Sequence, residues 1–135
     1  MDISNMNLEK FKATGLSILI IKNEKILFQS KEEMSKPLVK AIRETDMNDA
    51  TVYDKIVGRA AALLFIYAKV KKVFGVVASK PAIEMAQKFG LILTPGIITE
   101  NIMNHAGSDT CPMDKLSAGK TPEEFYKILL EKIKN

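Results

Sequence analysis

The only histidine and the only cysteine of the chain, His105 and Cys111, stand six residues apart in the segment NHAGSDTCPMD, residues 104–114. A pair of this kind fits a metal site, a nucleophile with its base, or an ordinary loop. A structural zinc site takes four ligands, usually in close Cys/His pairs. This segment adds only Asp109 and Asp114, and aspartates in a polar loop usually face solvent or cap a helix. We therefore expect no metal and no cofactor here.

Cys111 has a structural interpretation and a chemical one. Pro112 suits the first position of a helix, which makes Cys111 the N-cap. A thiol at a helix N-terminus can be reactive, and it can act as a nucleophile if a base lies beside it. His105 is the only imidazole, and its spacing does not place it against the thiol. We favour a small, half-buried thiol at a helix start, and keep an enzyme that uses Cys111 without metal as an alternative.

A second group of residues that could do chemistry stands in DKIVGRAAALL, residues 54–64. The pattern predicts a helix over residues 54–69 that begins with Asp54 as its N-cap. Lys55 and Arg59, four residues apart, would share a face of this helix. Their positive charges oppose the partial positive charge of a helix N-terminus. An anion supplied from outside would balance such a cluster.

Gly58 supports the same hypothesis. Glycine in a helix interior costs about 1 kcal/mol relative to alanine, and the close approach of a ligand or of another backbone would explain that cost. We expect Lys55 and Arg59 to contact the anion, Gly58 to give it room, and Asp54 to be a candidate general base. In the ordinary alternative, the two cations reach solvent along their stems and Gly58 admits a neighbouring helix.

The loop before Cys111 is the expected second wall of this site. Its residues GSDT, 107–110, form turns readily. Their backbone amides and hydroxyls can cradle an anion. The ligand-binding residues that we expect in this loop are Asn104, Gly107, Thr110 and Cys111.

Composition limits the class of protein. The chain has 135 residues, 47% apolar and 27% charged, which is typical of one globular domain over residues 1–135. Its net charge of +4 is spread along the chain, which permits a small anionic partner but does not indicate nucleic acid. The longest apolar run, residues 60–68, is far shorter than the roughly 20 residues that cross a bilayer. A single cysteine fits a reducing cytoplasm, and residues 1–15 do not resemble a signal peptide.

Local patterns predict the elements that must position these residues. β-Branched runs joined by a short turn predict a hairpin, and Thr121 with Glu124 forms a capping box at the start of the last helix. The order of elements predicts a three-layer α/β/α sandwich around a mixed sheet. Helices are expected over residues 4–15, 35–44, 54–69, 79–90 and 121–134, strands over 16–22, 25–30, 72–79 and 91–94, and one or two helical turns within 94–104.

Three stretches taken together resemble a known family. These are D-K-x-x-G-[KR]-A-A-A at residues 54–62, C-P-M at residues 111–113, and the segment 79–91 between them. They resemble a prokaryotic family of unknown function, domain of unknown function 1893. The resemblance runs over nearly the whole chain and implies the cytidine deaminase-like fold. In the family pattern an arginine often stands where this chain has His105, which implies that His105 is not a required base.

The resemblance also implies what is missing. Zinc deaminases hold their metal with H-x-E at the start of one helix and P-C-x-x-C at the start of the next. Ala82 and Met85 stand where the two cysteines would be, and residues 54–56 contain no histidine. We therefore expect a deaminase-like domain without zinc that binds a small anionic ligand, of which a nucleotide is one example. The alternatives are a metal-independent enzyme using Cys111 or Asp54, and a structural protein that assembles with copies of itself.

Overall fold

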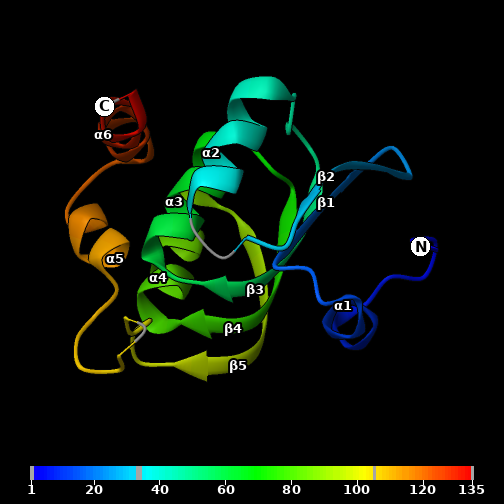
Figure 1. Ribbon diagram of the computed structural model, residues 1–135, viewed down its shortest axis with the longest axis horizontal. Helices are drawn as coiled ribbons and strands as arrows, with labels where there is room; N and C mark the ends of the chain where they lie inside the picture. Colours follow the sequence, from blue (N-terminus) through cyan, green and yellow to red (C-terminus); the bar gives the residue numbers. More distant parts are fainter. Residues whose placement is uncertain (1, 33–34, 105, 135) are drawn as a thin grey trace.

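The computed structural model describes residues 2–32, 35–104 and 106–134, which fold as a five-stranded sheet with helices on both faces (Figure 1). In chain order the elements are α1 (Leu8–Thr14), β1 (Ile18–Lys22), β2 (Lys25–Ser30), α2 (Ser35–Glu44), β3 (Thr51–Val57), α3 (Arg59–Tyr67), β4 (Lys72–Ser79), α4 (Lys80–Phe89), β5 (Ile92–Thr99), α5 (Pro112–Ser117) and α6 (Pro122–Lys134). The strands lie side by side in the order β2-β1-β3-β4-β5. β1 pairs antiparallel with β2 and β3, whereas β3, β4 and β5 run parallel. The predicted α/β architecture with a mixed sheet is confirmed.

The two faces of the sheet are covered unequally. On one face α1 packs through Phe11 against Leu19 and Tyr53. On the other face α2, α3, α4 and α6 build the larger core (Figure 1). Five of the nine residues of α3 are buried, so the apolar run 60–68 lies inside this core. Within the described residues, no helix has both the length and the apolar character needed to cross a membrane.

The sequence prediction was wrong about the start of the central helix. Residues 51–57 form β3, which lies between β1 and β4 and is paired along both edges. The segment TVYDKIV is rich in β-branched and aromatic residues, which favours a strand in the middle of a sheet. The helix expected over residues 54–69 begins only at Arg59, and Gly58 is its N-cap in an extended conformation. Asp54 and Lys55 therefore lie in a strand.

β5 is longer than predicted. It continues past Pro95 and Gly96 to Thr99, so the helical turns expected within residues 94–104 were also wrong. Proline and glycine favour a turn when they are considered locally. An outermost strand tolerates proline, because one of its edges has no neighbouring strand that needs the missing amide.

Several helix ends follow the local signals. Gly90 ends α4 in the left-handed conformation (φ 77°). Cys111 is the N-cap of α5, as predicted, although its thiol makes no capping hydrogen bond. At the start of α6, the Glu124 amide donates to Oγ1 of Thr121 (3.2 Å), and the Thr121 amide donates to Oε1 of Glu124 (2.9 Å). The predicted capping box is confirmed.

Candidate functional site

The first turn of α3 is capped by a carboxylate from a distant part of the chain. The backbone amide of Ala60 donates to Oδ1 of Asp114 (3.0 Å), a residue in the first turn of α5. Asp114 is only 5% exposed. A helix N-terminus favours negative charge and leaves amides without intrahelical acceptors. The chain itself thus supplies an anion to this helix end.

Gly58 makes room for this carboxylate. A Cβ atom at position 58 would lie 2.3 Å from Oδ2 and 2.6 Å from Oδ1 of Asp114, distances far inside van der Waals contact. The sequence predicted a close approach at Gly58 by a ligand or another backbone. In the structure, the Asp114 side chain makes that approach.

Arg59 fastens α5 to the same helix start. Its Nε donates to Oγ of Ser117 (3.1 Å), and its Nη2 donates to the backbone carbonyl of Asp114 (2.8 Å). Ser117 is completely buried and donates to the same carbonyl (2.7 Å). The guanidinium therefore joins two elements that are more than 50 residues apart in the sequence.

Opposing effects act on the charge of Asp114. Burial raises the pKa of its carboxyl group above the usual value. The amides of Ala60 and Arg59 and the positive charge of Arg59 act in the opposite direction. The pKa remains raised, because the loss of solvent outweighs these contacts.

Asp54 lies towards the carboxyl end of β3, beside Ile18 of β1 and Gly75 of β4. Its side chain is half-buried. The amide of Ile56 approaches its Oδ1 at 3.4 Å. Burial raises the pKa of Asp54 to about 7, against the lowering effect of the amides of Ile56 and Lys55. Asp54 is therefore the candidate site residue whose carboxyl group titrates near neutral pH.

Lys55 and Arg59 do not share a helix face, contrary to the prediction. Lys55 is an exposed residue of β3, and its backbone amide donates to the carbonyl of Ser17 (2.9 Å). Arg59 lies beyond the end of that strand and is half-buried against α5. The two cations thus lie in different elements, Lys55 near the end of β3 and Arg59 at the start of α3.

The loop between β5 and α5 is held by its own hydrogen bonds. Met103 and Thr110 form an isolated antiparallel bridge. The Ser108 amide donates to Oδ1 of Asn104 (3.1 Å), and the Gly107 amide donates to the carbonyl of Asn104 (3.0 Å). The Thr110 amide also donates within the loop, to Oδ1 of Asp109 (2.8 Å). These three amides, which the sequence suggested as an anion cradle, thus have acceptors inside the loop.

Cys111 follows this loop directly, and its amide donates to the carbonyl of Ile102 (2.8 Å). The side chain of Cys111 is half-buried. His105 lies outside the described residues, so the predicted relation between the imidazole and the thiol stays untested. α5 is the part of this region that reaches the start of α3.

The sequence did not indicate that Asp114 and Ser117 lie at one site with Gly58. Asp114 was expected to face solvent or to cap a helix, and Ser117 was not singled out. Both are polar residues on a short helix, and both are buried. Their partners, Gly58 and Arg59, are distant in the chain, so no local spacing indicates the contact.

The residues at the two relevant helix starts do not fit a zinc ion. α3 begins with Gly58 and Arg59, and α4 begins after Ser79, whose buried hydroxyl accepts from the amide of Ala82 (3.2 Å). Ala82 offers no ligand atom, and Met85 offers a thioether rather than a thiolate. Zinc sites are built from thiolate, imidazole and carboxylate ligands. Across residues 2–32, 35–104 and 106–134, no three such side chains gather where they could hold a metal ion.

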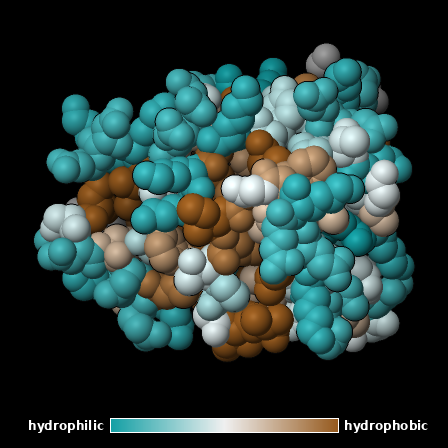
Figure 2. Space-filling view, turned by 180° about the vertical axis from the view of Figure 1, so that it is seen from behind, coloured by the Kyte–Doolittle hydropathy of each residue, from teal (hydrophilic) through white to brown (hydrophobic). Residues whose placement is uncertain are grey.

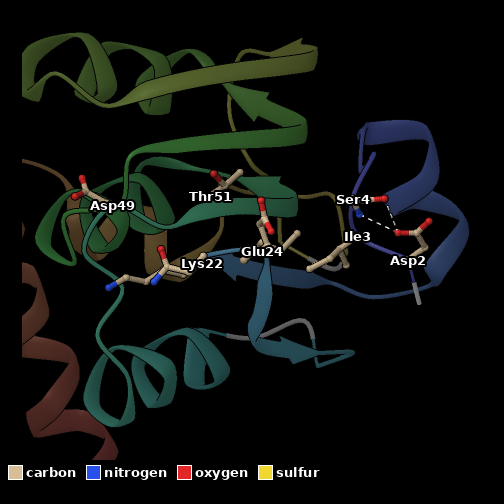
Figure 3. A pocket seen from close by; sticks show the side chains of 9 residues that line it. Asp2, Ile3, Ser4, Lys22, Glu24, Asp49 and Thr51 are labelled. Atoms are coloured by element: carbon tan, nitrogen blue, oxygen red, sulfur yellow. Dashed lines mark hydrogen bonds between the residues drawn. The ribbon is translucent and has the colours of Figure 1, made fainter.

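A separate cavity of about 570 Å³ lies at the other end of β3 (Figure 3). It is lined by the N-terminal segment around Asp2, by the hairpin turn with Lys22 and Glu24, and by the start of β3. The ammonium group of Lys22 is paired with Asp46, at 3.3 Å from Oδ2 and 3.0 Å from the backbone carbonyl. Because Thr51 is the first residue of β3, this cavity is remote from Gly58 and is not part of the candidate site.

Sequence comparison decides the family. The model of the family described as Domain of unknown function (DUF1893) matches residues 6–133. The chain belongs to this family. A crystal structure of a DUF1893 family protein from Thermotoga maritima is similar over 93% of this chain and 86% of its own, with a TM-score of 0.85 and 30% sequence identity. A search of curated proteins finds no match.

Solved deaminases share the fold of this DUF1893 protein at low sequence identity. The dCMP deaminase of cyanophage S-TIM5 in apo form has a TM-score of 0.50 and 16% identity, over 65% of this chain and 90% of its own. A diaminohydroxyphosphoribosylaminopyrimidine deaminase/5-amino-6-(5-phosphoribosylamino)uracil reductase of Thermotoga maritima gives a TM-score of 0.49 and 13% identity, over 61% of this chain and 29% of its own. The match to the dCMP deaminase shows that the DUF1893 chain has a deaminase-like fold, and its activity must be argued from its own residues.

Proposed function

We propose that this DUF1893 protein is a binding domain that holds a small anionic molecule at the carboxyl ends of its parallel strands. The observation that carries the proposal is the attachment of α5 to the first turn of α3 by Asp114 and Arg59. Through it, the segment after β5 returns to the end of β3. Open α/β sheets bind ligands outside the carboxyl ends of their strands.

The anion would be bound by side chains rather than by the amides of α3. Asp114 already accepts from the Ala60 amide, and its carboxylate fills the space over Gly58. Lys55 is an exposed residue of β3, four residues before Arg59 in the chain. Nε and Nη2 of Arg59 are engaged with α5, and its Nη1 has no hydrogen-bond acceptor among the described residues. In this proposal Lys55 and Nη1 of Arg59 contact the anion.

Asp54 supports an anionic ligand in spite of its acidic side chain. Burial raises its pKa to about 7, so a large share of the molecules carry a protonated carboxyl group at neutral pH. A protonated carboxyl group donates a hydrogen bond to an oxygen of the ligand and does not repel it. The loop residues Asn104, Gly107, Thr110 and Cys111 would border the ligand on the side of α5.

Lys55→Ala is expected to remove ligand-induced stabilisation. The probes are inorganic phosphate and dCMP, each tested by thermal unfolding over a concentration series. At a hundred times its dissociation constant a ligand adds about 2.7 kcal/mol, equivalent to a rise in Tm of several degrees for a chain of this size. The rise should be present in the wild type and lost in the Lys55→Ala variant.

Lys25→Ala is the matched control, because Lys25 is an exposed lysine at the start of β2, on another strand. It should keep the full rise in Tm. Equal stabilisation of the wild type and Lys55→Ala would contradict the proposed site. Arg59→Ala is a poorer first test, since it also removes two hydrogen bonds that hold α5.

One observation favours a second candidate function, a metal-independent enzyme. A general acid or base works best when its pKa lies near the working pH, and the pKa of Asp54 is about 7. Chromatography of the probe after long incubation separates binding from turnover. If the domain is an enzyme, a new product appears with the wild type and not with Asp54→Asn. Fast alkylation of Cys111 at neutral pH would instead assign the chemistry to the thiol.

A further inference from the structure

β5 is an outermost strand with an open hydrogen-bonding edge. It is the last strand in the sheet order and is paired with β4 alone among the described residues. Its eight residues, ILTPGIIT, contain no charged side chain. Natural edge strands are usually protected from pairing with other chains by charges, bulges or prolines. In β5, Pro95 is the only such protection.

The same strand gathers exposed apolar side chains. Ile92, Ile97 and Ile98 are 56%, 61% and 54% exposed. Ile97 also continues an apolar row across the sheet, since Ile56 pairs with Val77 and Val77 pairs with Ile97. Figure 2 shows a compact apolar area at the lower edge of the molecule, where Figure 1 places β5. Ile92 and Ile98 project from one face of the strand and Ile97 from the other, so exposed apolar side chains flank the open edge on both sides. Exposed apolar groups at such an edge mark an interaction surface.

We infer that β5 is the interface of a homodimer, in which the strands of two copies pair antiparallel and join their sheets into one of ten strands. A strand that pairs with its own copy about a two-fold axis presents the same residues from both sides. The isoleucines of each copy would then lie against those of the other. This inference does not depend on the proposed ligand site.

The charges beyond the two ends of β5 favour an identical partner in the antiparallel direction. Lys88 lies in the last turn of α4, four residues before the strand begins, and Glu100 follows the strand directly. With the axis near Pro95, the Glu100 end of one copy lies beside the Lys88 end of the other. Glu100 already forms an ion pair with Lys80 (2.5 Å), so a second cation would add to an existing pair. A parallel arrangement would set like charges side by side.

Pro95 limits the pairing to two shorter ladders. It is the only residue of β5 without a backbone amide hydrogen, and it stands near the middle of the strand. The ladders on either side of it keep their donors. With fewer backbone hydrogen bonds available at this edge, the stability of the dimer depends mainly on the contacts between apolar side chains.

Sedimentation velocity over a concentration series tests the dimer. The wild type should form dimers, and Ile97→Lys should raise the dimer dissociation constant more than about tenfold, because each copy would bring a charged ammonium group against the apolar side chains of the other. Ile26→Lys is the matched control: Ile26 is a 38% exposed isoleucine on β2, the opposite outermost strand. It should leave the constant unchanged. A wild type that stays monomeric, or an Ile97→Lys variant that dimerises normally, would overturn the inference.

A charge exchange tests the antiparallel direction without touching the apolar surface. Lys88→Glu and Glu100→Lys should each weaken the dimer by a few-fold, and the double variant should restore it, because each charge again meets its opposite. Recovery in the double variant requires that the partner be a second copy. If the single variants weaken the dimer and the double variant does not restore it, the antiparallel arrangement is wrong.

Discussion

Gly58→Ala should lower the free energy of unfolding by about 3 kcal/mol. The new methyl group would lie 2.3 Å from Oδ2 of Asp114, so the carboxylate must leave its place and give up the Ala60 amide. Backbone strain is not the reason, since the φ of Gly58 is −94°, a value that alanine adopts freely. Urea denaturation followed by circular dichroism measures the loss, and Tm should fall by about 10 °C.

A double-mutant cycle separates this contact from other effects. Asp114→Ala removes the cap and leaves a buried amide without its acceptor, which should cost about 2 kcal/mol. In that background Gly58→Ala has space for its methyl group and should cost little more. The expected result is strong non-additivity between the two positions. If the two costs simply add, Asp114 is not what makes glycine necessary at position 58.

The cap on α3 has a counterpart at the start of α4. The amide of Ala60 donates to Asp114, and the amide of Ala82 donates to the hydroxyl of Ser79. Both helix starts are therefore capped by side chains of the chain itself. The anion of the proposed function would have to be held by other groups.

Much of the fold could be predicted because the signals were local. The hairpin, α2, β4 and α4 follow from short runs, glycine stops and turn residues, and the capping box at Thr121 fixed the start of α6. β3 was missed although its own residue types favour a strand. The apolar run after Gly58 favours extending a helix backwards over Asp54, and the pairing of β3 with β1 and β4 decides for the strand.

The candidate site was predictable only in part. The sequence indicated that the segments 54–64 and 104–114 belong together, and the bonds of Arg59 to α5 bring parts of both into contact. It did not indicate which residues make the contact. An aspartate in a helix first turn looks solvated until a distant glycine is placed beside it, and the burial of Asp114 depends on the whole tertiary arrangement.

Asp54→Asn is expected to change how stability depends on pH. The carboxyl group of Asp54 has a pKa of about 7 in the folded protein, because burial disfavours its charged form, compared with 3.8 for the model value. Between these two values the folded protein holds a proton that the unfolded chain has released. The free energy of unfolding therefore falls as the pH rises through this window. At 1.36 kcal/mol per pKa unit the fall is at most about 4 kcal/mol.

The side-chain amide of the Asp54→Asn variant does not titrate. The free energy of unfolding of the variant should therefore lack the decrease with rising pH that Asp54 causes in the wild type. The variant should gain about 2 kcal/mol relative to the wild type between pH 5 and pH 8, because a half-buried carboxylate is still partly solvated. Urea denaturation at each pH gives both curves. The raised pKa of Asp114 is present in both proteins and cancels in the comparison.

Asp46→Asn is the control for this experiment. The Asn48 amide and Lys22 lower the pKa of Asp46 below 3.8, so Asp46 is ionised in both the folded and unfolded states throughout the tested range, and its substitution should change stability by a constant amount there. Parallel curves for the wild type and Asp54→Asn would contradict the raised pKa of Asp54. They would also remove the basis for Asp54 as a hydrogen-bond donor to an anion or as a general acid, because a carboxyl group with an ordinary pKa is fully charged at neutral pH.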